Sequence, residues 1–205
     1  MAEAYQRQHA LAYRALDGVA RARAQQGFGM RMWPEPAAGQ ICLRGDANGR
    51  FAALVESVCG VPLPVAANTV STAGDGGRDR RILWLGPDEW LAVCADDELH
   101  TLLVALHAAL AGEHSLVSDV SHARVVIALE GEHARDVLCK GCSLDLDPVA
   151  FRVGQCAQTS LARAHMLLHQ IGEAPRYHIY AQRSFAGYLY SWLEDAAREY
   201  TRPSP

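Results

Sequence analysis

The pattern of apolar and polar residues after residue 40 repeats itself along the chain. Residues 41–46 form a short apolar run that ends in a glycine and an acid, and residues 48–58 carry apolar side chains at helical spacing. Residues 126–132 form a second run of this kind, and a helical pattern again follows it. The glycines of the two copies, Gly45 and Gly131, lie 86 positions apart. The pattern therefore predicts two related strand–helix units.

A second pair of elements follows at a similar distance. The apolar residues 90–94 lead into a helical pattern over residues 97–111, and residues 177–181 lead into another over residues 184–199. Each copy is thus predicted to contain a strand, a helix, further strands and a final helix. One such unit cannot bury both helices and a sheet face alone, so we expect an α+β fold in which two pseudo-repeated units pack together.

These patterns divide the chain into an arm and a domain. Residues 2–26 are rich in Ala and Arg and predict a helix, which glycines and prolines between residues 27 and 39 interrupt. We expect residues 1–39 to form an N-terminal helical arm and linker, partly mobile unless a partner docks it. The single α+β domain is predicted at residues 40–200, with half-repeats at 40–112 and 117–200.

The helix predicted at residues 184–199 has the clearest pattern. Ser184 can cap its first turn. Apolar side chains at helical spacing predict its buried face, which comprises Phe185, Tyr188, Leu189, Trp192 and Leu193.

Composition and charge exclude some classes of function. Half of the 205 residues are apolar and a fifth are charged, which is typical of a globular protein with a sizeable core. The net charge of −4, from 19 basic and 23 acidic residues, provides no basic stripe for a phosphate backbone. We expect no nucleic-acid partner.

The sequence also predicts neither export nor a membrane partner. The first thirty residues lack the apolar segment of a signal peptide. The longest apolar run, residues 102–111, contains His107 and is shorter than the roughly 20 residues that span a bilayer. We expect a cytoplasmic protein, in which the six scattered cysteines should be free thiols.

The pair Cys139 and Cys142 supports two opposed interpretations. A zinc site would need Cys156 and a distant histidine as further ligands. A thioredoxin-like site needs the pair at the start of a helix, whereas here the helical pattern ends near Cys139 and Gly141 is typical of a C-cap. The position favours a structural turn over a redox or metal site. Asp145 and Asp147 should be turn or capping acids.

His165 and His169 have the spacing of metal ligands on a helix. Residues 161–171, however, alternate as a strand does, which would hold the two rings apart. Partly buried or surface histidines are therefore the favoured interpretation.

Two further runs contain suggestive residue types. Residues 118–122 include Ser, Asp and His, but contiguous residues cannot fold into a catalytic triad, so Asp119 or Ser121 should stabilise a turn. Residues 74–77 are rich in glycine without the spacing of a phosphate loop, and they predict a hairpin loop.

Several blocks together resemble one family. They comprise residues 43–46, 63–69, 83–91, 119–121, 140–147 with Phe151, and 154–159. In order and spacing they are similar to the gamma subunit of heterotetrameric sarcosine oxidase. The resemblance covers about residues 40–200, and its most specific blocks are residues 84–90 and 142–159.

This resemblance implies a fold similar to the folate-binding aminomethyltransferase of the glycine cleavage system. The assembled oxidase of the family demethylates sarcosine to glycine, with hydrogen peroxide and formaldehyde or methylene-tetrahydrofolate as the other products. The resemblance also implies alpha, beta and delta partner subunits. FAD, FMN, NAD and tetrahydrofolate are expected on the larger subunits and zinc on the smallest one.

The resemblance allows a test of whether this chain is itself a transferase. Folate enzymes of this fold place a carboxylate just after the block that corresponds to residues 154–159. Here residues 148–172 contain no Asp or Glu. Without an acid, no group can steer or protonate the pterin amine, and kinship of fold does not transmit activity. We expect no catalytic, cofactor-binding or metal-binding residue in this chain.

The sequence therefore predicts a non-catalytic structural subunit that holds the large subunits of a flavin-dependent sarcosine oxidase in register. Tryptophan is enriched in interface cores, so Trp84, Trp90 and Trp33 are candidate interface residues. A place in the core of the chain is the alternative for Trp84 and Trp90. Two other hypotheses are a free-standing tetrahydrofolate-dependent aminomethyltransferase-like protein and a thiol or zinc protein that uses the cysteine pair.

Overall fold

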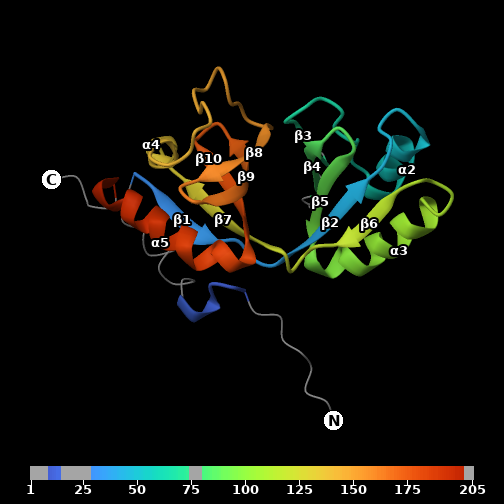
Figure 1. The fold of residues 1–205 in the computed structure, drawn as a ribbon, viewed down its shortest axis with the longest axis horizontal. Coiled ribbons are helices and arrows are strands. Elements are labelled where there is room, and N and C mark those ends of the chain that lie inside the picture. The colour runs from blue at the N-terminus through green and yellow to red at the C-terminus, as the bar shows by residue number, and fades with distance from the viewer. Residues whose placement is uncertain (1–8, 15–28, 74–79, 201–205) are drawn as a thin grey trace, which may run out of the picture.

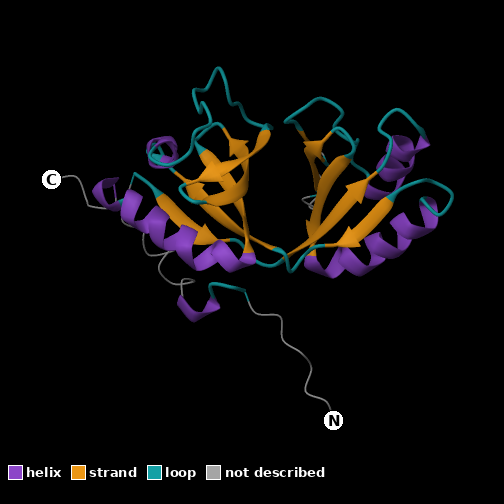
Figure 2. Cartoon of the chain, in the orientation of Figure 1, coloured by secondary structure: helices purple, strands orange, loops and turns teal. Residues whose placement is uncertain are grey.

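The computed structural model describes residues 9–14, 29–73 and 80–200. They form two five-stranded antiparallel sheets that face each other, with the helices on their outer sides (Figures 1 and 2). The resulting layers are helix, sheet, sheet and helix. Because both faces of each sheet are covered, a strand such as Glu89–Ala95 is buried at five consecutive positions.

The first sheet, at the right of Figure 1, has the strand order β3-β4-β5-β2-β6. Its strands are β2 (Ala38–Arg44), β3 (Val70–Thr72), β4 (Arg81–Gly86), β5 (Glu89–Ala95) and β6 (Leu116–Asp119). The helices α2 (Arg50–Cys59) and α3 (Leu99–Ala109) cover its outer face. Both helices predicted in this half are confirmed. Their apolar faces bury Phe51, Val55, Leu102 and Leu106 against the sheet.

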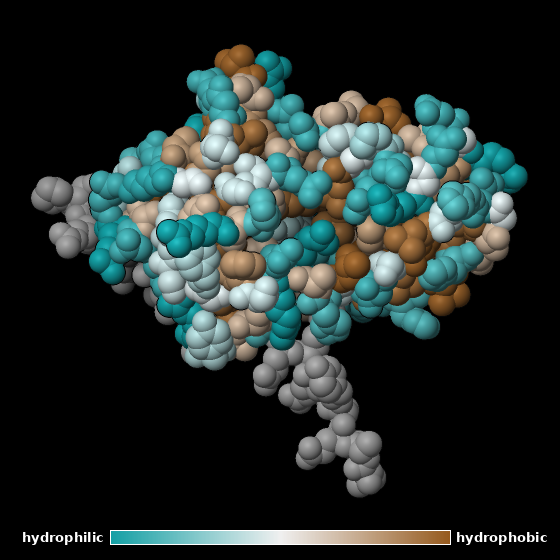
Figure 3. All heavy atoms as spheres, viewed as in Figure 1, coloured by the Kyte–Doolittle hydropathy of each residue, from teal (hydrophilic) through white to brown (hydrophobic). Residues whose placement is uncertain are grey.

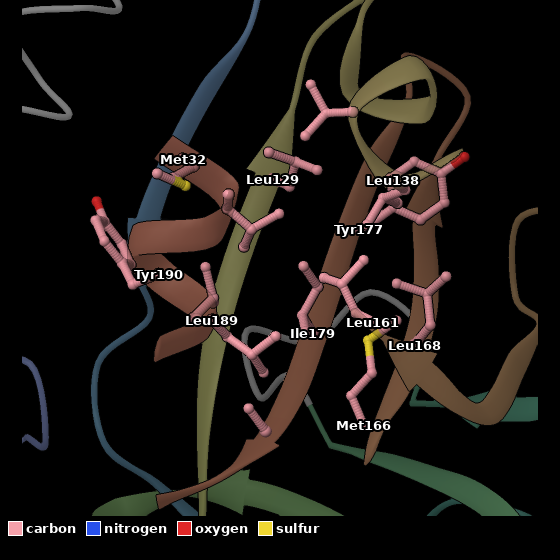
Figure 4. Packing of buried hydrophobic residues seen from close by; sticks show 14 of the residues in the cluster. Met32, Leu129, Leu138, Leu161, Met166, Leu168, Tyr177, Ile179, Leu189 and Tyr190 are labelled. Atoms are coloured by element: carbon pink, nitrogen blue, oxygen red, sulfur yellow. The ribbon is translucent and has the colours of Figure 1, made fainter. Parts of the chain in front are cut away.

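The second sheet has the strand order β1-β7-β10-β9-β8. Its strands are β1 (Arg31–Pro34), β7 (Arg124–Glu130), β8 (Cys156–Leu161), β9 (Ala164–Gly172) and β10 (Arg176–Gln182), and its helices are α4 (Ala134–Cys139) and α5 (Ala186–Ala196). Figure 4 shows how the apolar side chains of α5, such as Leu189, meet those of the strands, such as Leu129 and Ile179. This cluster is the largest core of the molecule's described residues.

One edge strand of each sheet comes from the part of the chain that forms the other sheet. β1 precedes β2 in the sequence yet pairs with β7, and β6 precedes β7 yet pairs with β2. The two connections therefore pass each other at the bottom of the view in Figure 1. With this exchange, both sheets have one strand order when β3, β4, β5, β2 and β6 are matched with β8, β9, β10, β7 and β1.

Hydrogen bonds fasten this crossing. The Gln40 amide donates to Ser121 Oγ at 2.9 Å, and the Val120 amide donates to the Gln40 carbonyl at 2.9 Å. Asp119 Oδ1 accepts hydrogen bonds from both the amide and the hydroxyl of Ser121. The prediction that Asp119 and Ser121 stabilise a turn is confirmed, and that turn holds β6 and β7 to β2.

The inner faces of the sheets form a separate apolar core. Four residues come from each sheet: Leu83, Leu85, Leu91 and Val93 from the first, and Val126, Cys156, Leu167 and Tyr180 from the second. The sheets are also joined beyond this core, where the Val70 amide donates to the Gly154 carbonyl and the Cys156 amide donates to the Asn68 carbonyl, both at 2.9 Å.

The boundary predicted for the N-terminal arm at residue 39 is corrected by the structure. Residues 31–34 form β1, and Met30 and Met32 are buried in the core of the second sheet. Most of the helix predicted at residues 2–26 lies outside the described residues. In the described part, Leu11 is buried in the same core and Arg14 pairs with Glu194 of α5 at 2.7 Å. These residues pack on the domain because they bring an apolar side chain and an ion pair to it.

The helix predicted at residues 184–199 is present, but its buried face differs from the prediction. Phe185 and Tyr188 are about 40% exposed, at 38% and 42%. The chain enters α5 through a 3₁₀ turn at residues 183–185, which has three residues per turn and so turns Phe185 away from the helix face. Ser184 is not the N-cap of either element, because the cap residues are Gln182 and Phe185. The buried stripe consists of Ala186, Leu189, Tyr190 and Leu193.

Among the described residues, no helix combines the length and the apolar character that a membrane crossing requires. The hairpin loop predicted at residues 74–77 lies outside the described residues. The strands on either side of it, β3 and β4, pair in the antiparallel sense that a hairpin requires.

Candidate functional site

A series of side-chain hydrogen bonds from Arg81 through His178 to Glu35 crosses from one sheet to the other. Arg81 lies at the start of β4, His178 is on β10, and Glu35 directly follows β1. Arg81 Nη1 lies 3.2 Å from His178 Nδ1, and His178 Nε2 lies 3.1 Å from Glu35 Oε1. All three residues line a cleft of about 470 Å³ between the sheets.

The chemistry of the arginine fixes the state of this imidazole. A guanidinium only donates hydrogen bonds, so Nδ1 of His178 accepts and Nε2–H donates to Glu35. Burial lowers the pKa of His178, although the neighbouring Glu35 opposes that shift. The hydrogen bond from His178, with help from Arg176, holds the pKa of Glu35 below its ordinary value. The arrangement is thus a neutral histidine between a cation and a carboxylate.

The polar chain continues along the edge of the second sheet. Arg176 Nη2 donates to Glu35 at 3.4 Å and Nε lies 3.8 Å from Glu130, to which Arg31 donates at 2.7 Å. The two guanidiniums also lie 5.4 and 5.5 Å from the ring centroid of Trp33. Trp33 is half-buried and makes a cation–π contact with each arginine. Its ring is therefore partly exposed at the surface and lies between two cationic side chains.

The other two predicted interface tryptophans occupy different environments. Trp90 is completely buried, its Nε1 donates to the Pro64 carbonyl at 2.8 Å, and its ring lies 5.7 Å from that of Phe51. Trp90 therefore presents no surface to a partner, and the alternative of a core residue is correct for it. Trp84 pairs with Trp90 across the turn at residues 86–89, but it is only half-buried.

The cysteine pair occupies the end of α4. The helix ends at Cys139, which is exposed. Partial desolvation of its thiol, together with the nearby Asp136, raises the pKa of that thiol. Cys142 Sγ lies 3.9 Å from Thr159 Oγ1. A raised pKa at a helix C-terminus opposes thiolate chemistry. All six cysteines are free, as the sequence predicts.

Gly141 does not act as the predicted C-cap. The cap position is Lys140, and Gly141 does not belong to the described glycines with a left-handed backbone. A Cβ atom at this position would instead lie 2.5 Å from Cζ2 of Trp192 on α5. A glycine is required there because the tryptophan ring packs directly on the backbone. Asp145 and Asp147 accept hydrogen bonds from amides two residues further on and are turn acids, as predicted.

The two histidines with metal-ligand spacing lie on a strand, as the alternation predicts. Four residues along β9 separate them by about 13 Å. His165 is exposed and 3.1 Å from Ser160 Oγ, whereas His169 is buried, and burial with the nearby Arg81 lowers its pKa to about 3. Within the described ranges, no three His, Cys, Asp or Glu side chains come close enough to hold a metal ion.

We expect no folate-binding carboxylate around β8 and β9, because residues 148–172 contain no Asp or Glu. A cleft of about 450 Å³ lies here, and its described lining includes Arg124, Ser143, Gln158, His165 and Gln182 but no carboxylate. A histidine cannot supply the negative charge of a carboxylate, because an imidazole is either neutral or positive. The described lining of this cleft therefore contains no acidic side chain.

Sequence reasoning did not find the chain of Glu35, Arg81 and His178. The three residues are far apart in sequence and belong to no motif. One signal was available, because His178 alternates with Tyr177 and Ile179 in a strand and therefore points to the opposite face.

The architecture belongs to a known class. The chain superposes on the aminomethyltransferase T of the glycine cleavage system from Bartonella henselae with a TM-score of 0.64 and 15% identity, over 88% of this chain and 49% of that one. At this identity the likeness shows the fold alone. The protein is therefore an α+β protein with an aminomethyltransferase-like fold, as the resemblance implied.

Sequence comparison then identifies the family. The model of the sarcosine oxidase gamma subunit family matches residues 44–199. Sarcosine oxidase subunit gamma from Corynebacterium sp. (strain P-1) is 40% identical over 164 residues, which cover 80% of this chain and 77% of that protein. The corresponding protein from Arthrobacter sp. is 35% identical over 82% of this chain and 79% of its own length.

A solved structure agrees with these matches. A chain of the heterotetrameric sarcosine oxidase from Corynebacterium sp. U-96, in complex with pyrrole 2-carboxylate, superposes with a TM-score of 0.85 and 32% identity. The superposition covers 97% of this chain and 98% of that one. The chain belongs to the sarcosine oxidase gamma subunit family.

Proposed function

We propose that this chain is the gamma subunit of a heterotetrameric, flavin-dependent sarcosine oxidase and has a structural, non-catalytic role there. Membership of the family supports the first part. The observation that carries the second is the cleft at β8 and β9, where the described lining lacks the carboxylate of a folate enzyme. The charged groups between the sheets are paired with one another, which suits a scaffold better than an active site.

The finer parts of the proposal follow from the resemblance. The complex would convert sarcosine to glycine in the cytoplasm, with hydrogen peroxide and formaldehyde or methylene-tetrahydrofolate as products. FAD, FMN, NAD, tetrahydrofolate and zinc would be held by the alpha, beta and delta subunits. We also propose that residues 40–112 and 117–200 are half-repeats, which the matching order of β3-β4-β5-β2 and β8-β9-β10-β7 supports.

Affinity capture tests this proposal. The chain is tagged and produced with and without the proposed large subunits. We expect the tagged chain to retrieve a flavin-containing complex that oxidises sarcosine, and to contain no flavin when produced alone. Failure to retrieve any large subunit would overturn the proposal.

The alternative is a free-standing tetrahydrofolate-dependent aminomethyltransferase-like protein, which the shared fold favours. Calorimetric titration of tetrahydrofolate into the isolated chain distinguishes the two. We expect no saturable binding, because the described lining of the cleft at β8 and β9 contains no acid for the pterin amine. Stoichiometric binding would favour the alternative.

A further inference from the structure

Arg124 carries a positive charge that the described part of the fold does not neutralise. Glutamates pair with the half-buried arginines Arg14, Arg31, Arg80 and Arg176, at 2.7 to 3.4 Å. Arg124, at the start of β7, is also half-buried, yet no ion pair or side-chain hydrogen bond joins its guanidinium to another described residue. Charges that are withdrawn from water are normally paired. Arg124 therefore favours an anion that the chain does not itself provide.

Arg124 lines the cleft beside β8 and β9, which contains no opposite charge. The cleft has a volume of about 450 Å³, within the roughly 300–1,000 Å³ that is typical of ligand pockets. Arg124 is the only Lys, Arg, Asp or Glu in its described lining, whose other polar groups are hydroxyls, amides and one imidazole. Hydrophobic and hydrophilic residues are mixed over the face shown in Figure 3, so hydropathy does not single out a ligand site there. The unbalanced charge of this cleft does.

Several uncharged side chains of the cleft can still donate hydrogen bonds. Gln182 lies directly opposite Arg124 on the neighbouring strand, so its amide and the guanidinium lie on the same face of the sheet. Gln182 and Ser143 form no side-chain hydrogen bond with another described residue. Gln158 Nε2 donates to the Leu85 carbonyl at 2.8 Å, which occupies one of its two N–H groups. The cleft thus combines one cation with neutral donors.

The charges beyond this cleft do not neutralise Arg124 either. Arg124 also lines a neighbouring cleft of about 880 Å³, where Glu89 is the one acid of the described lining. Glu89 lies 3.7 Å from a guanidinium nitrogen of Arg44, and it accepts the thiol of Cys42 at 3.7 Å. Arg183 brings a second cation to the same lining. The two described linings that contain Arg124 therefore carry more positive than negative charge.

We propose that the cleft beside β8 and β9 binds a small hydroxylated carboxylate that carries no basic amine. Arg124 holds the carboxylate, because the paired N–H groups of a guanidinium match its two oxygens and balance its single charge. The hydroxyl and amide side chains of the lining bind the ligand's hydroxyls. An ammonium group would find no acid in the described lining, so amino acids such as sarcosine and glycine are excluded. This site goes beyond the proposed structural role and does not depend on it.

Calorimetric titration of the full chain with three matched probes tests the proposal. Gluconate carries a carboxylate and several hydroxyls, sorbitol has a neutral hydroxymethyl group in place of the carboxylate, and glucosaminate adds an ammonium group. We expect saturable binding of gluconate. Sorbitol and glucosaminate should bind at least about tenfold more weakly, because the first loses the charge-assisted hydrogen bonds and the second brings an unpaired charge. Absence of gluconate binding, or equally tight binding of either analogue, would overturn the proposal.

Charge-matched variants assign the carboxylate to Arg124. Arg124→Gln removes the cation, and Arg163→Gln is the control, because Arg163 is exposed on the turn between β8 and β9 and lies outside the described lining. We expect Arg124→Gln to weaken gluconate binding at least about tenfold and Arg163→Gln to leave it unchanged. Arg124→Lys, which keeps the charge without the planar fork, should bind with intermediate affinity. Circular dichroism checks that each variant folds. Equal affinities of the two Gln variants would contradict the role of Arg124.

A carboxylate side chain of a large subunit is the competing occupant of the cleft. Capture of the large subunits by tagged Arg124→Gln distinguishes it, and we expect the same amount as with the unchanged chain. A loss of capture by the folded variant would assign the cleft to the subunit contact and contradict a free ligand. Failure of the unchanged chain to capture any large subunit would overturn the proposed function alone, because gluconate binding is measured without partners.

Discussion

Trp192 packs so closely on the backbone of Gly141 that the smallest side chain has no room there. We expect Gly141→Ala to lower the free energy of unfolding by about 1–3 kcal/mol, because the added methyl would overlap the indole ring. Urea titration of the isolated chain measures this. Gly112→Ala is the control, since a Cβ at that position meets nothing within 4 Å. Equal stability of the two variants would contradict this account of Gly141.

The buried Trp90 is expected to contribute to stability through both its ring and its nitrogen. Trp90→Phe leaves the Pro64 carbonyl without its donor and removes part of the ring, so we expect a loss of about 2 kcal/mol or more. Thermal unfolding should show a lower midpoint for Trp90→Phe than for Trp33→Phe, whose ring is partly in solvent. A larger effect at Trp33 would show that the roles are reversed.

At the scale of single residues, the sequence indicates which positions are special but not which residues surround them. The turn that pairs Trp84 with Trp90 was predictable from Gly86 and Pro87. The sequence did not predict which of the two tryptophans lies in the core. Both strands are apolar on both faces, so alternation of apolar and polar residues cannot tell the buried face from the exposed one. Gly141 was recognised as a special position, but the reason lies on a helix some fifty residues away.

Strands β9 and β10 carry two buried histidines whose titration should make stability depend on pH. The pKa of His169 falls from 6.5 to about 3 on folding, and that of His178 also falls. Below pH 6.5 the unfolded chain therefore binds protons that the folded chain does not, so the free energy of unfolding decreases as the pH falls. The pKa of Glu35 is lowered from 4.5 on folding, so Glu35 further decreases the free energy of unfolding as the pH falls below 4.5.

We expect the free energy of unfolding to drop by about 2 kcal/mol between pH 7 and pH 5 through His169 alone. Urea titrations across this range measure the slope. His169→Leu should reduce the slope, whereas His165→Leu, at an exposed site on the same strand, should leave it unchanged. A slope that His169→Leu does not alter would contradict the assignment.

Elements with many local contacts were the predictable ones. The helices α2, α3 and α5 followed from residue spacing, and β9 followed from alternation. The strand β1 was missed because four residues ending in proline carry little periodic signal, and the partner that fixes them, β7, lies almost a hundred residues away. A larger separation, 143 residues, hid the pairing of Glu35 with His178.

At the scale of the whole molecule, the exchanged edge strands join the two sheets into one body. Each sheet depends on a strand from the other side of the crossing, and a common apolar core lies between them. The recurring strand–helix pattern predicted two units, but no local feature of β1 or β6 predicts that they change sheets. The lack of Asp and Glu in residues 148–172, by contrast, follows directly from the sequence, because it concerns only the residue types of one segment.

The central claim is that this chain supports a sarcosine oxidase without performing its chemistry. Sarcosine-dependent formation of hydrogen peroxide, measured on the purified chain alone and on the complex captured with it, tests that claim most directly. We predict peroxide formation by the complex and none by the chain, even when FAD, FMN and tetrahydrofolate are supplied. Turnover by the isolated chain, or a captured complex that does not oxidise sarcosine, would contradict it.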